Sequence, residues 1–145
     1  MKKFELTAES KINIFGKKLF RIKALISFGD VEEGETGGWI EKEENLEQSS
    51  GDAWVYGDAE VSGNAEVYGN ADYTTIHGFG TQFRTTTFFQ CEDKQIRVSC
   101  GCFLGTIPEF REQVKNTREG KIAEEYLMIA DLMEKHFVKE KESGE

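Results

Sequence analysis

The sequence contains little proline, histidine and cysteine, and it has no long apolar run. Of its 145 residues one is proline, two are histidine and three are cysteine. No apolar stretch approaches the roughly 20 residues of a membrane-spanning helix, and the first residues, MKKFELTAES, lack the apolar segment of a secretory signal peptide. We therefore expect a cytoplasmic protein that has no membrane partner.

The three cysteines suggest neither disulfide bonds nor a metal site. Cys91, Cys100 and Cys102 are odd in number, and a single glycine separates the last two, which suits neither a disulfide framework nor an oxidising compartment. Together with His77 or His136 they offer the right atoms for zinc, but the spacing C-x8-C-x-C is not typical of zinc sites. We expect reduced thiols packed on strands, and neither a metal nor a cofactor.

The net charge of -9 is concentrated in one segment. Residues 1–29 carry seven Lys or Arg and two acids, residues 30–72 carry thirteen acids and one base, and residues 73–145 carry ten bases and twelve acids. A strongly acidic surface repels nucleic-acid phosphates and attracts basic protein surfaces. The charge pattern therefore argues against direct nucleic-acid binding and favours a basic protein partner.

A six-residue repeat, GDAWVYGDAEVSGNAEVYGNAD, occupies residues 51–72. Glycine recurs at 51, 57, 63 and 69, alanine at 53, 59, 65 and 71, and valine at 55, 61 and 67. Alanine and valine two residues apart would face the same side of a short strand, and glycine followed by Asp or Asn would supply each turn. The repeat is typical of a β-solenoid, in which residues eighteen apart stack, for example Ala53 on Ala71.

Strand hairpins are expected on both sides of the repeat. Alternating apolar residues predict strands at Ile12–Phe15 and Leu19–Ile26, joined by a turn around Gly16. After the repeat, Arg84–Cys91 and Gln95–Phe103 are predicted to form a second hairpin around a polar turn.

Two helices are expected at the end of the chain. Thr106 and Glu109 have the spacing of a capping box, and Pro108 suits the first turn of the helix that follows. A second helix would place one apolar stripe on its buried face. The stripe consists of Ile122, Tyr126, Ile129, Ala130, Met133 and Phe137.

These elements predict a mainly β protein, built on a short β-solenoid of the left-handed β-helix type. The expected organisation is an N-terminal β-hairpin cap over residues 1–30 and solenoid coils over residues 31–90, which include the hexapeptide repeat at 51–73. A C-terminal β-hairpin and two α-helices would form a lobe over residues 91–145.

Two stretches of the sequence, RIKALISFGDVEEGETGGWIEKEENL and the repeat that follows it, are similar to a known family. They resemble the hexapeptide-repeat, left-handed β-helix proteins that are common in phage and prophage genomes. The resemblance covers residues 3–76. It implies the fold, a mobile-element origin and, for a phage-encoded chain, the host cell cytoplasm as the location, but it says little about chemistry because the fold serves many functions.

An acidic surface with aromatic side chains is the leading candidate site. If the valines of the repeat face inward, their neighbours in the sequence face solvent. Aromatic residues beside charge are common at protein interfaces, whereas the acids lack the spacing of a calcium-binding loop. The predicted partner-binding residues are Glu41, Glu43, Glu44, Trp54, Tyr56, Asp58, Glu60, Glu66, Tyr68 and Asp72.

The function expected from these observations is that of a non-enzymatic, phage-type binding protein. Its acidic, aromatic surface would cover a basic surface of a host protein, for example the nucleic-acid-binding face of a defence protein such as a CRISPR effector. We expect it to act as an inhibitor of host defence and to form a homo-oligomer, without cofactor or catalytic residue.

Two other functions stay open. A sponge for signalling nucleotides could use GFGTQFRTTTFF, which combines glycines, aromatic rings, a base and threonine hydroxyls; its candidate residues are His77, Phe79, Phe83, Arg84 and Thr85. A hexapeptide-repeat acyltransferase would use His77 as its base. That reaction also needs a carboxylate that orients the histidine, which the sequence cannot place.

Overall fold

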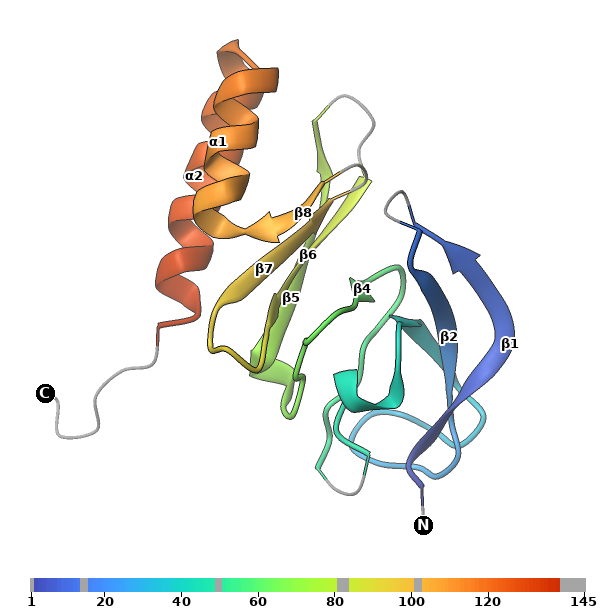
Figure 1. Cartoon of the computed structure of the whole chain (residues 1–145). Helices are drawn as coiled ribbons and strands as arrows, with labels where there is room; N and C mark the ends of the chain where they lie inside the picture. The colour runs from blue at the N-terminus through green and yellow to red at the C-terminus, as the bar shows by residue number, and fades with distance from the viewer. Residues whose placement is uncertain (1, 14–15, 49–50, 81–83, 101–102, 139–145) are drawn as a thin grey trace, which may run out of the picture.

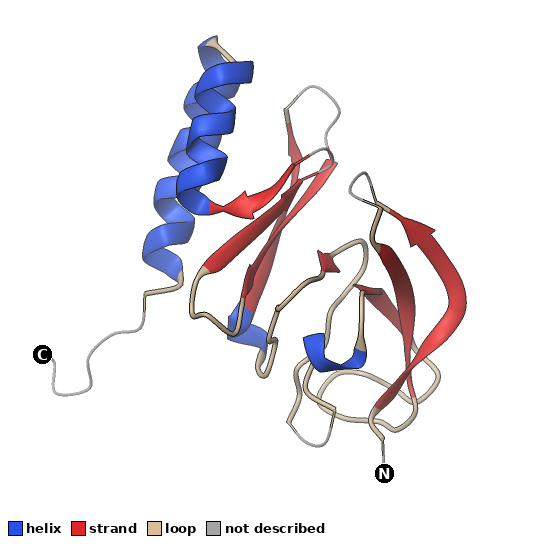
Figure 2. Ribbon diagram, in the orientation of Figure 1, coloured by secondary structure: helices blue, strands red, loops and turns tan. Residues whose placement is uncertain are grey.

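The computed structural model describes residues 2–13, 16–48, 51–80, 84–100 and 103–138, and within them the chain forms two four-stranded sheets and two α-helices. The strand orders are β1-β2-β3-β4 in the first sheet and β5-β6-β7-β8 in the second. Figure 1 shows the second sheet between the helices and the segment that carries β4, with β1 and β2 at the far side. Figure 2 shows how much of the first half is loop.

The first sheet contains three antiparallel strands and one short parallel strand. β1 (Phe4–Ile12) pairs with β2 (Lys18–Ala24), and β2 pairs with β3 (Thr36–Ile40). β4 (Glu60–Val61), which lies in the repeat, pairs with β3 in the parallel direction. β2 buries Leu19, Ile22 and Ala24, so the alternation that its sequence predicts is interrupted, and its pairing with β3 shifts register between Arg21 and Lys23.

The second sheet is antiparallel throughout, and consecutive strands are neighbours. Its strands are β5 (Tyr73–Phe79), β6 (Arg84–Gln90), β7 (Ile96–Cys100) and β8 (Phe103–Thr106). Because successive side chains of a strand point to opposite faces, β6 contributes Phe89 to one core and Phe88 to the other.

Both predicted helices are present, and the predicted cap is confirmed. α1 (Ile107–Thr117) begins after Thr106, whose hydroxyl accepts a hydrogen bond from the Glu109 backbone N–H, while Glu109 Oε1 accepts from the Thr106 N–H at 2.8 Å. α2 (Gly120–His136) follows after a short turn. Both helices bury one face against the second sheet.

The prediction of a β-solenoid is wrong. The repeat contributes one two-residue strand, β4, and a 3-10 turn at Asn70–Asp72, and the chain folds as two separate sheets instead of stacked coils. The parallel partners lie 21 residues apart, as in Ile40 with Val61 and Leu46 with Val67, and not eighteen. The repeat is long enough for little more than one coil, and one coil cannot exclude water from a core. Antiparallel strands from the flanking segments cover the core instead.

The inward orientation is confirmed for the three valines and for Ala53, Ala59 and Ala65, whereas Ala71 is exposed and does not stack on Ala53. Val55, Val61 and Val67 are fully buried. They belong to the first core, which consists of Phe4, Ile22, Ala24, Val31, Ile40, Leu46, Ala53, Trp54, Val55, Ala59, Val61, Ala65, Val67, Phe89 and Cys91. The second core lies between the second sheet and the helices and consists of Phe88, Val98, Ile107, Phe110, Val114, Tyr126, Ile129, Ala130 and Met133.

Candidate functional site: an acidic surface with two exposed tyrosines

The acidic segment is partly neutralised within the chain. Three ion pairs connect it to the basic first 29 residues: Lys2–Glu43 at 2.8 Å, Lys11–Glu60 at 2.6 Å and Lys17–Glu41 at 3.8 Å. Glu41 also accepts a hydrogen bond from the Gly63 backbone N–H at 2.7 Å. Three of the acids predicted to bind a partner are therefore engaged in the fold itself.

Trp54 does not face solvent, so its predicted place in the partner-binding surface is wrong. Its side chain is fully buried, and its ring makes edge-to-face contacts with Phe4 and Phe28. Ala53, Trp54 and Val55 are buried in succession, because this segment is an extended loop that is covered on both sides. A Cβ at Gly37 would lie 2.6 Å from the Val55 carbonyl oxygen, so only glycine permits the close approach of β3.

Tyr56 is 43% exposed and is held in place through its backbone. Its N–H donates a hydrogen bond to the Tyr73 hydroxyl at 3.0 Å, and burial raises the pKa of Tyr73 to about 12. Burial first, and then nearby negative charges, also raise the pKa of Tyr56. These charges belong to Asp30, Glu35 and Asp52, and together with Tyr56 they form the Tyr56 cluster.

Tyr68 is 54% exposed and has a similar setting. Its N–H donates to Asp72 Oδ2 at 3.0 Å, so Asp72, which was predicted to bind a partner, instead fixes the turn that presents this tyrosine. Burial first, and then nearby carboxylates, raise the pKa of Tyr68. The carboxylates are those of Glu66, Glu47 and Glu92, and together with Tyr68 they form the Tyr68 cluster.

The fold brings Glu92 to Tyr68 from the turn between β6 and β7. The Glu92 N–H donates to the Asn64 carbonyl oxygen at 2.8 Å, and the Glu66 N–H donates to the Gln90 carbonyl oxygen at 2.8 Å. These bonds connect the repeat to the second sheet, so that the charges of Glu66 and Glu92, from different parts of the chain, both raise the pKa of Tyr68.

Both clusters border the turn at Gly51 and Asp52. Asp52 belongs to the Tyr56 cluster, and a Cβ at Gly51 would lie 4.0 Å from the Tyr68 carbonyl oxygen. Among the ion pairs of the described residues, none involves Asp30, Glu35, Glu66 or Glu92.

Of the residues predicted to bind a partner, the structure brings only Tyr56, Tyr68 and Glu66 into these clusters. Asp58 and Glu44 are exposed, but in the described part of the chain they are outside both clusters. The sequence reasoning missed Asp30, Glu35, Glu47 and Glu92 as members of the site. Glu92 lies in a polar hairpin turn 24 residues beyond Tyr68, and no local signal relates the two.

The residues of the alternative ligand site are only partly placed. His77 is exposed on β5, and its Nδ1 lies 3.1 Å from the Thr85 hydroxyl of β6. Phe79 packs against the second core. Phe83 and the side chain of Arg84 lie outside the described residues. The nucleotide and acyltransferase functions therefore stay predictions.

The cysteines face different parts of the molecule. Cys91 lies in the first core, where burial raises the pKa of its thiol. Cys100 lies on the second-core side and accepts a hydrogen bond from the Thr86 hydroxyl at 3.1 Å, and Cys102 is outside the described residues. Over the ranges that the structure describes, no three His, Cys, Asp or Glu side chains are grouped so as to hold a metal ion.

No protein-family model matches this chain, and no curated protein is significantly similar to it. The resemblance to hexapeptide-repeat proteins of phages therefore stays a prediction. Neither helix of the described residues has the length and apolar character needed to cross a membrane.

Proposed function

We propose that the protein is a non-enzymatic binding protein whose two tyrosine clusters dock on an arginine-rich surface of a partner protein. The observation that supports this best is shared by both exposed tyrosines: nearby negative charges raise the pKa of each, and the carboxylates of Asp30, Glu35, Glu66 and Glu92 have no ion pair within the described chain.

The chemistry of the clusters fits a guanidinium group better than an ammonium group. A tyrosine ring attracts a cation that lies over its face, and arginine can stack on the ring while its N–H groups bind a carboxylate in a planar, two-point contact. Lysine offers one compact, strongly hydrated charge and no planar face.

The backbone contacts of both tyrosines support a binding role as well. The N–H of Tyr56 is bonded to the Tyr73 hydroxyl, and the N–H of Tyr68 is bonded to the Asp72 carboxylate. A ring held by a fixed backbone loses little conformational entropy on binding, which favours affinity. The expectation that the partner is a host-defence protein stays a prediction, because it depends on the resemblance.

A short polyarginine peptide and a polylysine peptide of equal length test the proposal by isothermal titration calorimetry on the full chain. We expect the polyarginine peptide to bind more tightly, and its affinity to fall as ionic strength rises because exposed charge pairs are screened. Equal affinity for both peptides would contradict the role of the rings.

Variants of the clusters sharpen this test. Tyr56→Ala with Tyr68→Ala should weaken polyarginine binding about tenfold or more, in the range of aromatic interface residues. Asp30→Asn with Glu35→Gln should weaken it and reduce its dependence on salt. The matched control is Glu112→Gln with Glu124→Gln, which removes the same charge from exposed helical positions; a loss as large in this control would contradict the proposal.

A further inference from the structure

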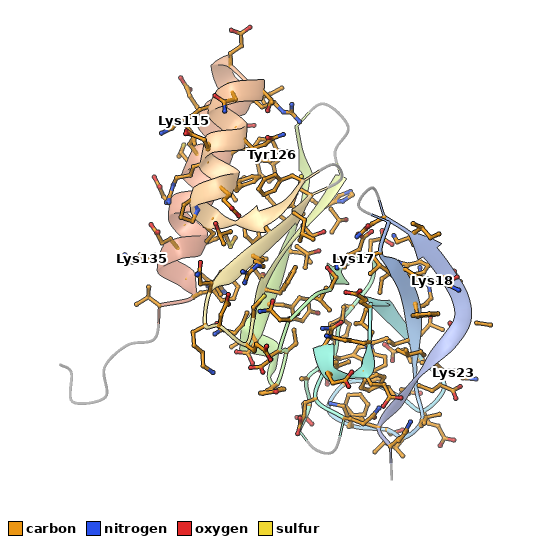
Figure 3. All side chains as sticks on the ribbon, viewed as in Figure 1. Lys17, Lys18, Lys23, Lys115, Tyr126 and Lys135 are labelled. Atoms are coloured by element: carbon orange, nitrogen blue, oxygen red, sulfur yellow. The ribbon has the colours of Figure 1, made fainter. Side chains whose placement is uncertain are left out.

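The outer face of α2 has two large apolar side chains in solvent. Met128 is 69% exposed and Leu132 is 58% exposed, and residues four apart are neighbours on a helix surface. The opposite face packs on the second core through Tyr126 and Met133. Figure 3 shows Tyr126 pointing toward the second sheet and Lys135 pointing away from it.

Charged residues continue this outer face along the helix. Intervals of four, three, four and three residues place Lys121, Glu125, Met128, Leu132 and Lys135 on one stripe, which we call the α2 stripe. Among the ion pairs of the described residues, none involves Glu125 or Lys135. Two adjacent apolar residues with charges at both ends have the pattern of a helix-pairing seam.

A second copy of α2, running in the opposite direction, complements the stripe. When Met128 faces Leu132 of the second copy, Glu125 faces Lys135 of the second copy, because both pairs are centred at the level of Ala130. The apolar side chains then cover each other, and opposite charges close both ends of the contact. Each contact occurs twice, as two-fold symmetry requires.

Other pairings of the same helix place like charges together. An antiparallel pair centred on Met128 would bring Lys121 to Lys135 of the second copy, twice in each dimer. A parallel pair around a two-fold axis would bring each residue of the stripe to its own copy, so that Glu125 meets Glu125. Charge complementarity therefore favours the antiparallel pair centred at Ala130 over both of these arrangements.

We propose that the chain forms a two-fold symmetric dimer through antiparallel α2 stripes, with Met128 against Leu132 and Glu125 against Lys135 of the second copy. The contact is small, so the dissociation constant is expected in the micromolar range. This inference does not depend on the proposed function, because the stripe lies on the helical side of the second core and the tyrosine clusters border the first core.

Sedimentation velocity on the full chain over a range of concentrations tests the dimer and its register. Glu125→Lys places lysine against lysine twice in each dimer, and Lys135→Glu places glutamate against glutamate twice, so each should weaken self-association about tenfold. The chain with both substitutions restores opposite charges, and its dissociation constant should return to within about threefold of the original. Rescue of this kind is specific to the proposed register.

Met128→Glu with Leu132→Glu should abolish the dimer at concentrations where the unchanged chain is half dimeric. Lys23→Glu is the matched control, because it reverses one exposed charge on β2, at the far side of the molecule from α2, and it should leave the dimer unchanged. Circular dichroism should show the same helix content in every variant. A chain that stays monomeric up to about 1 mM, or a double charge reversal that fails to restore association, would overturn the proposal.

Discussion

The two halves of the molecule reach a buried core by different means. In the second half, consecutive strands pair with one another and a capped helix hairpin covers them. In the first half, side chains join segments that are far apart in the sequence: Lys3 Nζ donates to the Ala53 carbonyl oxygen at 2.9 Å, and Gln48 Oε1 accepts from the Phe4 N–H at 2.8 Å. The first half therefore depends on contacts that form only when distant segments meet.

This difference has a consequence for stability. A hairpin or a capped helix is supported by its own neighbours in the chain, whereas the loops of the first half have few regular backbone pairs and depend on a few buried side chains. Single substitutions in the first half should therefore be more damaging than local ones in the second. β6 belongs to both cores through Phe88 and Phe89, so the halves are expected to unfold together.

The largest effect is expected for Trp54→Ala. The side chain fills the first core between Phe4 and Phe28, and removal of a buried aromatic residue costs about 3–5 kcal/mol through lost transfer energy and an unfilled cavity. Chemical denaturation followed by far-ultraviolet circular dichroism measures the free energy of unfolding. The matched substitution in the second core is Phe110→Ala.

The same two variants show whether the halves are coupled. A shared β6 predicts a single transition that moves to lower denaturant in both variants. If Trp54→Ala instead gave two transitions, with the helical signal lost at its original midpoint, the two halves would be independent folding units.

Asn45→Ala should have the next largest effect. The buried side chain accepts hydrogen bonds from the Glu41 and Lys42 N–H groups at 3.1 Å each, and donates to the carbonyl oxygens of Gly63 and Ala65 at 3.0 and 3.2 Å. The substitution removes the partner of four backbone groups, of which the Ala65 carbonyl is buried and the others are partly buried, and this costs about 3 kcal/mol.

Asn116→Ala is the control for this substitution, because it makes the same change at an exposed position of α1. It should shift the free energy of unfolding by less than about 0.5 kcal/mol. Equal losses in the two variants would mean that the amide of Asn45 does not hold the first half together.

The sequence predicts the second half better than the first, and the reason is the range of the interactions. Thr106, Pro108 and Glu109 encode a helix start within four residues, and the structure confirms it. The burial of Trp54 has no such local signal, since it depends on Gly37 and on the approach of β3. The repeat correctly predicts inward valines, but its period cannot reveal that sheets from elsewhere replace the missing coils.

The candidate site follows the same rule. The exposure of Tyr56 and Tyr68 could be predicted from their positions beside inward valines. The place of Glu92 near Tyr68 could not be predicted, because it depends on the pairing of the β6–β7 turn with the repeat. The ion pairs of Glu41, Glu43 and Glu60 could not be predicted from the sequence either, since their lysine partners are more than 20 residues away along the chain.

A smaller effect, visible mainly at alkaline pH, is expected for Lys3→Met. Burial lowers the pKa of Lys3, although the charges of Glu47 and Asp52 oppose that change. Between the lowered pKa and 10.5, the unfolded chain binds a proton that the folded chain has released, so the free energy of unfolding rises with pH. The unchanged chain should therefore gain stability relative to Lys3→Met as pH rises through the alkaline range toward 10.5.

The difference in stability between the unchanged chain and Lys3→Met does not contain the titrations of other groups, because both chains share them. The raised pKa values of Tyr56, Tyr68 and Tyr73 lower the stability of both chains above pH 10, the ordinary tyrosine pKa. Lys23→Met at an exposed position should show no such relative trend. A relative stability that falls with pH would mean that the amine of Lys3 is favoured in its charged form.

The smallest effect is expected for Thr106→Ala at the start of α1. The substitution removes the hydroxyl that accepts from the Glu109 N–H at 3.3 Å, and loss of such a cap costs about 1 kcal/mol. Thermal unfolding should still show one transition, and Thr75→Ala at an exposed position of β5 serves as the control. Because the remaining contacts of α1 are local, the loss of free energy of unfolding should stay well below that of Asn45→Ala. A comparable loss would mean that the second half depends on single side chains as much as the first half does.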